Sequence, residues 1–384
     1  MSAAEWLRRL LSPFVLLLTL LTAAIYTYVA MRLADGLAMR CVLAMPFLLI
    51  WLVPVIYWAG QRDQTNWLDH WLHYTSYLSM GWLSFVFILE LIRDGLEVFA
   101  SALNLLSVYD LLETSGSGAV LFLSLAAVAS GALRAGRGPG IKTVDIAIAN
   151  LPASLVGFRI VQISDLHVGP SIRQKYVERV VRIANELKPD LVALTGDIID
   201  GRVADLTKHV APLRGLTPSD RLFFITGNHE YYSGAAPWLD HFATLGMTIL
   251  SNSHVTLTHG DATLLIAGVV DPAVRITGSK NGPDPAAAAA GGTADIRILL
   301  AHNPKIAALA EPVGFDLQLS GHTHGGQFFP WTLVTRMVHA PHFVGLSRRG
   351  KMWVYVSAGT GTWGPPIRFG SESEITLVRL VGAV

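Results

Sequence analysis

Two long apolar runs near the N-terminus constrain this chain more than any other feature of its sequence. The first covers residues near 10–33 and carries no charge before Arg32, and the second covers 41–60. Each reaches the roughly 20 residues that a helix needs to cross a bilayer. The first run is too long for the apolar core of a signal peptide, and the second follows it closely. We therefore expect the N-terminal third to cross a membrane.

Two further runs extend this module. The run near 74–92 is more polar, with Glu90 near its end, and the run near 117–133 is short and rich in small residues that suit close helix contacts. Together they predict a module of about four transmembrane helices in residues 1–133. A buried helical domain that never meets lipid is the alternative interpretation.

Basic residues predict the orientation. With four spans, both termini lie on one side of the membrane. The positive-inside rule then places the C-terminal part in the cytoplasm, at a multi-pass inner (plasma) membrane, although an odd number of spans would reverse this. Arg8, Arg9, Arg62, Arg134, Arg137 and Lys142 fall on that side, against Arg32, Arg40 and Arg93 on the other.

Composition excludes several classes of partner and site. The formal net charge is +1 and 15% of the 384 residues are charged, so no global field indicates a nucleic-acid partner. The single cysteine, Cys41, excludes an internal disulfide and a cysteine-based metal site. The oligomeric state and the compartment stay open.

The sequence changes character after "RAGRGPG" (134–140), which is basic and glycine-rich. We expect residues 134–154 to be a linker and the start of a second domain, and 155–384 to be that domain. "SIRQKYVERVVRIANEL" predicts a helix with Ser171 as its N-cap. The low-complexity stretch 281–295 predicts a mobile surface loop. Short runs rich in β-branched and aromatic residues predict strands, which gives an α/β domain: "FRIVQISD", "DLVALTGD", "RLFFITGN", "TLLIAGVVD", "IRILLAHN", "FDLQLSGH" and "WVYVSAGTG".

Five of these strands end in side chains that can bind a metal. In α/β sheets such ligands collect at the carboxyl ends of strands, where the loops diverge from a rigid base. One strand that ends in a histidine means little, but five are hard to assign to chance. The residues are Asp165 and His167, Asp197 and Asp200, Asn228 and His229, His302, and His322 and His324.

The spacing and the chemistry of these residues both suggest one shared site. In extended chain, residues two apart point to the same side, so the pairs Asp165/His167 and His322/His324 can each aim two ligands into one space. Imidazole, carboxylate and amide oxygen without thiolate suit ions such as Mn, Fe, Co, Ni or Zn. Seven ligands are too many for one tetrahedral zinc and suit two metals that share a carboxylate.

The ordered motifs D-L-H, G-D-I-I-D, G-N-H-E, H and G-H-T-H resemble the signature of the calcineurin-like metallophosphoesterases over about 155–384. "SDLHVG", "SGHTHGGQ" and "YVSAGTGTWGPPIRF" are similar to its membrane-associated bacterial branch, some members of which are phosphodiesterases or UDP-2,3-diacylglucosamine pyrophosphatases. The resemblance implies an αββα sandwich and two divalent ions, Mn, Fe or Zn, with Mn favoured.

The resemblance also implies a role for each residue. Asp165, His167 and His324 correspond to ligands of the first metal, and Asn228, His302 and His322 to ligands of the second, with Asp197 bridging the two. His229 corresponds to the catalytic histidine and Asp200 to the carboxylate that orients it. Gln327 and Arg368 are further candidates for contacts with a substrate phosphate, and either His339 or His342 could line the pocket.

Three functions remain in competition. The first is a membrane-anchored phosphoesterase that hydrolyses a phosphodiester or pyrophosphate bond with metal-activated water. Its tether suggests an amphiphilic substrate at the lipid bilayer, although a tether can equally serve localisation alone. The second is a nucleotide phosphodiesterase that faces the cytosol. The third is a non-enzymatic, metal-loaded membrane sensor or scaffold, which would not need His229 and Asp200.

Overall fold

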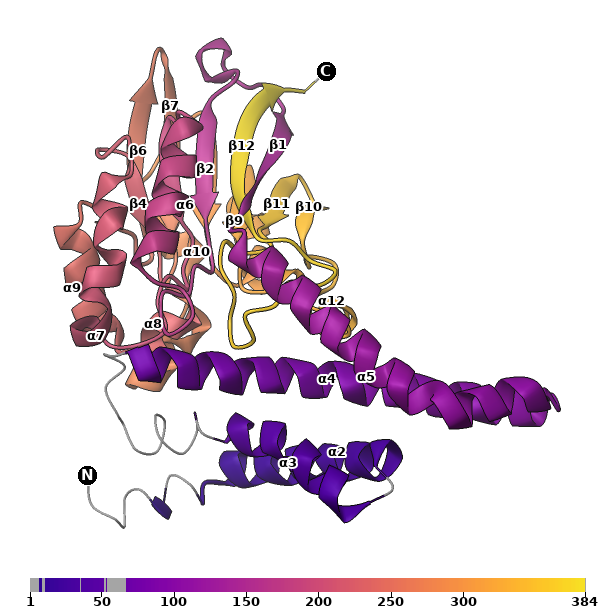
Figure 1. Cartoon of the computed structure of the whole chain (residues 1–384). Helices are drawn as coiled ribbons and strands as arrows, with labels where there is room; N and C mark the ends of the chain where they lie inside the picture. Colours follow the sequence, from indigo (N-terminus) through magenta and orange to yellow (C-terminus); the bar gives the residue numbers. More distant parts are fainter. Residues whose placement is uncertain (1–6, 9–10, 35, 52, 54–66, 384) are drawn as a thin grey trace. The chain divides into compact units, whose positions relative to one another are not determined.

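The chain divides into two units, each with its own secondary structure (Figure 1). Unit 1 comprises Met1–Arg134 with Gly364–Phe369, and unit 2 comprises Ala135–Trp363 with Gly370–Val384. Unit 1 is helical, and all the described strands lie in unit 2. The structure, a computed structural model, describes residues 7–8, 11–34, 36–51, 53 and 67–383.

Three helices of the N-terminal region are long and apolar enough to cross a bilayer. They are α2 (Pro13–Leu33), α4 (Trp67–Ala102) and α5 (Leu106–Gly136). A fourth apolar helix, α3 (Leu37–Ile50), has 14 residues, fewer than the roughly 20 that a span requires.

The predicted spans agree with these helices to different degrees. The first matches α2, which begins where the Ser12 side chain accepts a hydrogen bond from the Val15 N–H. The third and fourth lie within α4 and α5, which are much longer than predicted. Residues 54–60 of the second span, like Arg9 and Arg62, lie outside the described residues. The structure thus supports about three apolar helices, and a fourth span stays a prediction.

A network of charges ties α2 to α4 within unit 1, buried at Glu90 and Arg93 and partly exposed at Arg32 and Asp94. Arg93 donates to Glu97 at 2.8 Å and lies 3.3 Å from Glu90, whose side chain is fully buried. Arg32 of α2 pairs with both Asp94 and Glu97 of α4 at 2.6 Å. Because each buried carboxylate faces a guanidinium, the network fixes how the two helices pack.

Arg93→Met should lower the thermal stability of the full chain in detergent, because Glu90 would stay buried without its cation. Removing one partner of a buried ion pair costs about 3–5 kcal/mol. The matched control is Arg134→Met, in the exposed last turn of α5. A scanning-fluorimetry midpoint that moves equally little for both variants would contradict the structural role of Arg93.

Unit 2 contains two six-stranded sheets, each with parallel and antiparallel neighbours. The first sheet has the order β1 (Gly140–Ile148), β12 (Glu374–Gly382), β2 (Arg159–Ile163), β3 (Leu191–Leu194), β4 (Leu222–Phe224) and β5 (Thr248–Ile249). The second has the order β10 (Gly345–Arg349), β11 (Met352–Val356), β9 (Leu317–Ser320), β8 (Ile296–Leu300), β7 (Ala262–Gly268) and β6 (Ser253–His259).

Seven α-helices and six short 3-10 helices accompany the sheets among the described residues of unit 2. The α-helices are α6 (Gln174–Glu186), α7 (Val203–Val210), α8 (Asn228–Tyr232), α9 (Ala235–Thr244), α10 (Pro285–Ala289), α11 (Ala307–Ala310) and α12 (Trp331–His339). The 3-10 helices are η2 (Ala153–Leu155), η3 (Ala211–Gly215), η4 (Pro272–Thr277), η5 (Pro304–Ile306), η6 (Glu311–Val313) and η7 (His324–Gly326).

Alternation along the strands produces the layers. Ile160 of β2 and Ile266 of β7 belong to the apolar core between the two sheets. Their neighbours Val161 and Leu265 point the opposite way, toward α6, α7 and α9 on one side and α10 and α11 on the other. Figure 1 shows α6 lying across the first sheet. Because helices cover both outer faces, the fold is the expected αββα sandwich.

Two stretches of the predicted organisation differ from the structure. Residues 134–154, expected to be a linker and the start of the domain, contain β1, which pairs in parallel with β12. The alternation of Val144, Ile146 and Ile148 carried this signal, but the partner strand lies more than 200 residues away. The alternation indicates a strand, but the local sequence does not indicate so distant a partner.

The stretch 281–295 is not wholly a surface loop. It contains α10, in which Ala288 is fully buried in the core against β7. The Asp284 side chain starts this helix by accepting a hydrogen bond from the Ala287 N–H at 2.9 Å. Ser171 is not the N-cap of α6, because Arg173 holds that position without a side-chain bond. The buried face predicted for α6 is confirmed at Val177, Val180, Val181, Ala184 and Leu187.

Candidate metal centre

All nine predicted site residues follow the carboxyl ends of five strands, six of them in loops and three at the start of α8 or η7. Asp165 and His167 follow β2, Asp197 and Asp200 follow β3, and Asn228 and His229 follow β4. His302 follows β8, and His322 and His324 follow β9. Each of the nine contacts at least one other member of the set. The predicted convergence on one site is therefore what the structure shows.

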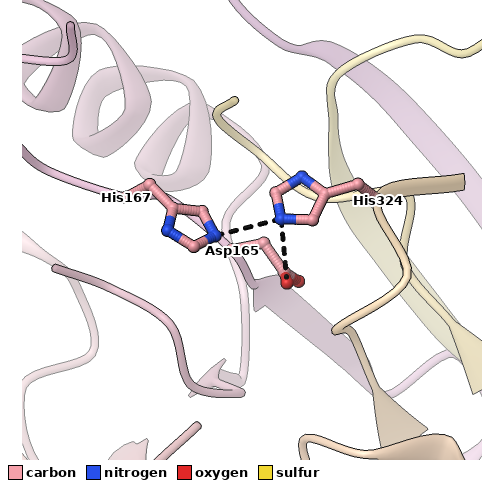
Figure 2. Close-up of side chains that lie close together, drawn as sticks. All are labelled: Asp165, His167 and His324. Carbon is pink, nitrogen blue, oxygen red and sulfur yellow. Dashed lines mark hydrogen bonds and ion pairs between the residues drawn. The ribbon is translucent and has the colours of Figure 1, made fainter. Parts of the chain in front are cut away.

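Asp165, His167 and His324 form one group of possible ligands (Figure 2). The Nε2 atoms of His167 and His324 point at each other across 3.0 Å, and Asp165 Oδ1 lies 3.5 Å from His324 Nε2. All three side chains are buried. Two imidazole nitrogens and a carboxylate that converge in a largely buried place are a donor set for a cation.

Asp197, His302 and His322 form a second group. His302 Nδ1 donates to the backbone carbonyl of Thr195 at 2.8 Å, which turns Nε2 toward Asp197 Oδ2 at 3.1 Å. A second-nitrogen hydrogen bond of this kind commonly orients a metal-binding imidazole. Asn228 Oδ1 lies 3.0 Å from His322 Nδ1 and adds an amide oxygen to the group.

The two groups meet at Asp197, whose carboxylate lies 3.9 Å from His167 Nε2 and forms a third possible ligand group with His167 and His229. Burial alone would raise the pKa of Asp197, but His302 and His229 hold it well below its usual range. Burial together with the charge of His302 lowers the pKa of His322 to about 3. Metals bind ionised carboxylates and neutral imidazoles. A bound cation would therefore displace the proton on His302, whose pKa is lowered by burial but raised well above its usual range by Asp197.

The predicted backbone geometry is wrong, although the convergence is right. The two pairs spaced by one residue follow their strands rather than lying within them, and their backbones are not extended. Five site residues have left-handed φ angles of 52–74°: Asp165, His167, Asp197, His322 and His324. Such conformations cost on the order of 1–3 kcal/mol each and cluster at functional sites. Strained loops, rather than the strand pleat, therefore aim the ligands.

Two glycines allow the loops to approach one another. A Cβ atom at Gly321 would lie 2.1 Å from Asp165 Oδ2, and one at Gly227 would lie 2.1 Å from Asp197 Oδ1. Real Cβ atoms essentially never approach other atoms so closely. Any side chain at either position would push a predicted ligand out of place.

Glu230 is a residue that the sequence interpretation missed. Its buried carboxylate accepts hydrogen bonds from the backbone N–H groups of Asp197, Ile198 and Gly227 at 2.6–2.9 Å. These bonds join the loop after β3 to the loop after β4. Burial, aided by the charge of Asp197, raises the pKa of Glu230 to about 7. The quoted G-N-H-E motif contained the signal, but one sequence gives no role to its last residue.

His229 and Asp200 form a pair beside the two groups. A carboxylate can only accept, so His229 Nδ1–H donates to Asp200 Oδ1 across 2.5 Å, while Asp200 Oδ2 lies 3.0 Å from His167 Nδ1. Burial opposes the charged form of His229, but Asp200 and Asp197 raise its pKa to about 9. The His229 ring is therefore protonated on both nitrogens and positively charged at neutral pH.

The remaining candidates have varied surroundings. The Gln327 amide is engaged with the Trp363 backbone, donating to its carbonyl at 3.0 Å and accepting from its N–H at 2.8 Å. Arg368 lies in the segment of unit 1 and donates its backbone N–H to Gly131. The His339 ring lies 5.3 Å from that of His322, while His342 is buried against Ser347. Of these residues, His339 lies beside a predicted ligand.

The chain is similar in sequence to proteins of one known family. A family profile described as calcineurin-like phosphoesterase matches residues 158–326. A Danio rerio protein named transmembrane protein with metallophosphoesterase domain is 38% identical over 272 residues, which cover 68% of this chain and 62% of that protein. An uncharacterized metallophosphoesterase of Aquifex aeolicus is 34% identical over 228 residues, which cover 58% of this chain and 85% of that protein. A solved structure of Thermus thermophilus sulfate thiohydrolase SoxB covers 60% of this chain and 58% of its own at 17% identity, with a TM-score of 0.38.

The chain belongs to the calcineurin-like metallophosphoesterase family. The family consists of metal-dependent phosphoester hydrolases, and the relatives of this chain include proteins named as transmembrane. The chain spans about 60% of the length of the Danio rerio and Bos taurus relatives, at 62% and 60%.

The residues present fit the divalent metals that the family binds. The donors are buried carboxylates and imidazoles in overlapping groups whose ligand atoms all lie within 4.8 Å of one another. Nitrogen and oxygen donors without thiolate suit Mn, Fe or Zn. The preference for Mn stays a prediction.

Gly321→Ala should lower the metal content of the purified full chain, because its methyl group would displace Asp165. The matched control is Gly215→Ala, where the nearest atom to the new Cβ would be Val181 Cγ1 at an ordinary 3.5 Å. Metal per chain would be measured by plasma mass spectrometry, with circular dichroism to check folding. Equal metal content in two folded variants would contradict the role of this close approach.

Proposed function

We propose that this protein is a membrane-anchored phosphoesterase with two metals, which hydrolyses a phosphodiester or pyrophosphate bond. The observation that carries the proposal is the pair of donor groups that meet at Asp197, beside the hydrogen-bonded pair His229 and Asp200. A structural metal site would need neither the second group nor an oriented, protonated histidine.

In this proposal, Asp165, His167 and His324 hold one cation, and Asn228, His302 and His322 hold the other. Asp197 lies between them and bridges both. Two divalent cations would activate water and neutralise charge on the phosphoryl oxygens. The chain would supply the ligands of both cations, and the strained loops fix the positions of those ligands.

His229 holds the proton for the leaving oxygen at Nε2. Asp200 binds Nδ1–H and fixes that tautomer, so Nε2 is the ring nitrogen left for the substrate. The pKa of about 9 keeps this proton in place at neutral pH. General acid catalysis by a positioned side chain typically contributes about 10²–10⁴-fold.

The surroundings of His229 favour a substrate with an organic group on its leaving oxygen. The ring of Tyr232 lies 5.2 Å from the His229 ring, and that of Trp363 lies 5.6 Å from it. Both aromatic side chains are more than half exposed. They offer a surface on which a base, sugar or aryl group can pack.

We further propose that the protein lies in the inner membrane with unit 2 in the cytoplasm, where an amphiphilic substrate such as a nucleotide-lipid would meet it. The basic residues that flank the apolar runs support this side with four spans, the number that this proposal requires, because an odd number would reverse it. The apolar helices support the anchor.

Asp197→Asn should remove most of the metal and most of the activity, because the bridging charge would be lost. His229→Ala should keep the metal and lose about 10²–10⁴-fold in kcat. Metal content by mass spectrometry and turnover of an aryl phosphodiester would be measured together. Equal metal loss in both variants would contradict the assignment of Asp197 as a metal ligand and of His229 as the general acid.

A substrate panel tests the reaction class. The full chain, purified in detergent and loaded with Mn, would be offered an aryl phosphodiester, an aryl phosphomonoester and UDP-diacylglucosamine, with His229→Ala as the control. We expect turnover of the diester or the pyrophosphate to exceed that of the monoester. A preference for the monoester would overturn the bond assignment, and turnover of none would favour the scaffold.

A further inference from the structure

Helix α12 is amphipathic in the inverse sense to a normal surface helix. Its half-buried side chains are Thr332, Thr335 and His339, spaced so that they share one helix face. Its large apolar side chains point outward instead, and Met337 is 83% exposed. A surface helix of a globular protein usually turns its apolar stripe toward the core.

The exposed apolar side chains of unit 2 are concentrated at this place. Among the described residues of unit 2, thirteen large apolar side chains are exposed, and seven of them lie between positions 331 and 346. We call these seven the α12 face. They are Trp331, Leu333, Val334, Met337, Val338, Val344 and Leu346. Scattered exposed apolar residues are normal, but the five on α12 recur at spacings of three and four positions and so lie together, as in an interaction surface.

The inner side of α12 lies against the candidate metal centre. A Cβ atom at Gly326 of η7 would be 2.2 Å from Thr332 Cα, so the helix and the turn that follows His324 are in direct contact. At the other end of the helix, the His339 ring lies 5.3 Å from the His322 ring. Helix α12 therefore borders the site with its inner side, and the α12 face lies on the side of the helix that points away from the site.

Four cations accompany the α12 face in the sequence, and one carboxylate, that of Glu311, lies among them against Gly350. The stretch 331–351 contains Arg336, Arg348, Arg349 and Lys351 and has no Asp or Glu. Arg348 is exposed and stacks on the ring of Trp353 at 4.1 Å. Apolar side chains with a tryptophan and a basic border are the features of helices that lie in the interface of an anionic bilayer.

We propose that the α12 face docks in the interfacial layer of an anionic lipid bilayer. The same chain carries three helices long and apolar enough to cross a bilayer, which would confine unit 2 to a membrane surface. A second copy is the less favoured occupant, because a symmetric contact would bring four cations of each copy together. Docking would hold the metal centre at the depth of lipid phosphates, a consequence that rests on the proposed function.

Site-directed spin labelling of the full chain tests this proposal without relying on activity. Met337→Cys would be made with Cys41→Ser, labelled with a nitroxide and placed in nanodiscs of phosphatidylcholine and phosphatidylglycerol. The control label is Val156→Cys, which is 58% exposed and lies before β2, at the end of the strand opposite the site. Val334→Cys provides a second label on the α12 face.

The measurement compares collisions of each label with oxygen, which dissolves in lipid, and with a water-soluble nickel chelate. We expect the labels at 337 and 334 to prefer oxygen severalfold more than the label at 156, and to lose part of that preference in pure phosphatidylcholine. Equal nickel access at 337 and 156 would overturn the proposal. Spin–spin broadening between labels at 337 would also overturn it, because the occupant would then be a second copy.

Discussion

The carboxylate of Asp197 is the point on which the site depends. Its backbone N–H is held by Glu230, and its carbonyl accepts the N–H of His167 at 3.1 Å. Its side chain accepts the N–H of His229 and faces His302 of the other sheet. One residue thus joins the loops of four strands from both sheets. Because its charge is buried, the site needs cations to balance it.

Seven of the twelve described strands and the convergence of the candidate site residues could be predicted from the sequence, because both leave local patterns. Apolar runs that end in Asp, Asn or His mark the strand ends, and parallel strands bring those ends together. The left-handed backbone φ angles of Asp165 and His322 could not be predicted, since Asp and His adopt such angles more often than most residues but still only rarely. The same applies to the pairing of β1 with β12, which depends on contacts distant in sequence.

The strain and the function share one physical cause. Left-handed backbone angles at ligand residues, close contacts at glycines and buried carboxylates each raise the free energy of the folded chain. Glu230 offsets part of this cost by accepting three backbone N–H groups. Bound cations would offset more, by neutralising Asp165 and Asp197 together. The inverse polarity of α12 is a similar local departure, which a bilayer surface would relieve.

Anomalous X-ray diffraction from crystals of the Mn-loaded full chain would test the central claim most directly. We predict two anomalous peaks, both within bonding distance of the Asp197 carboxylate, one beside Asp165 and the other beside His302. A single peak, or two peaks that do not share Asp197, would contradict it.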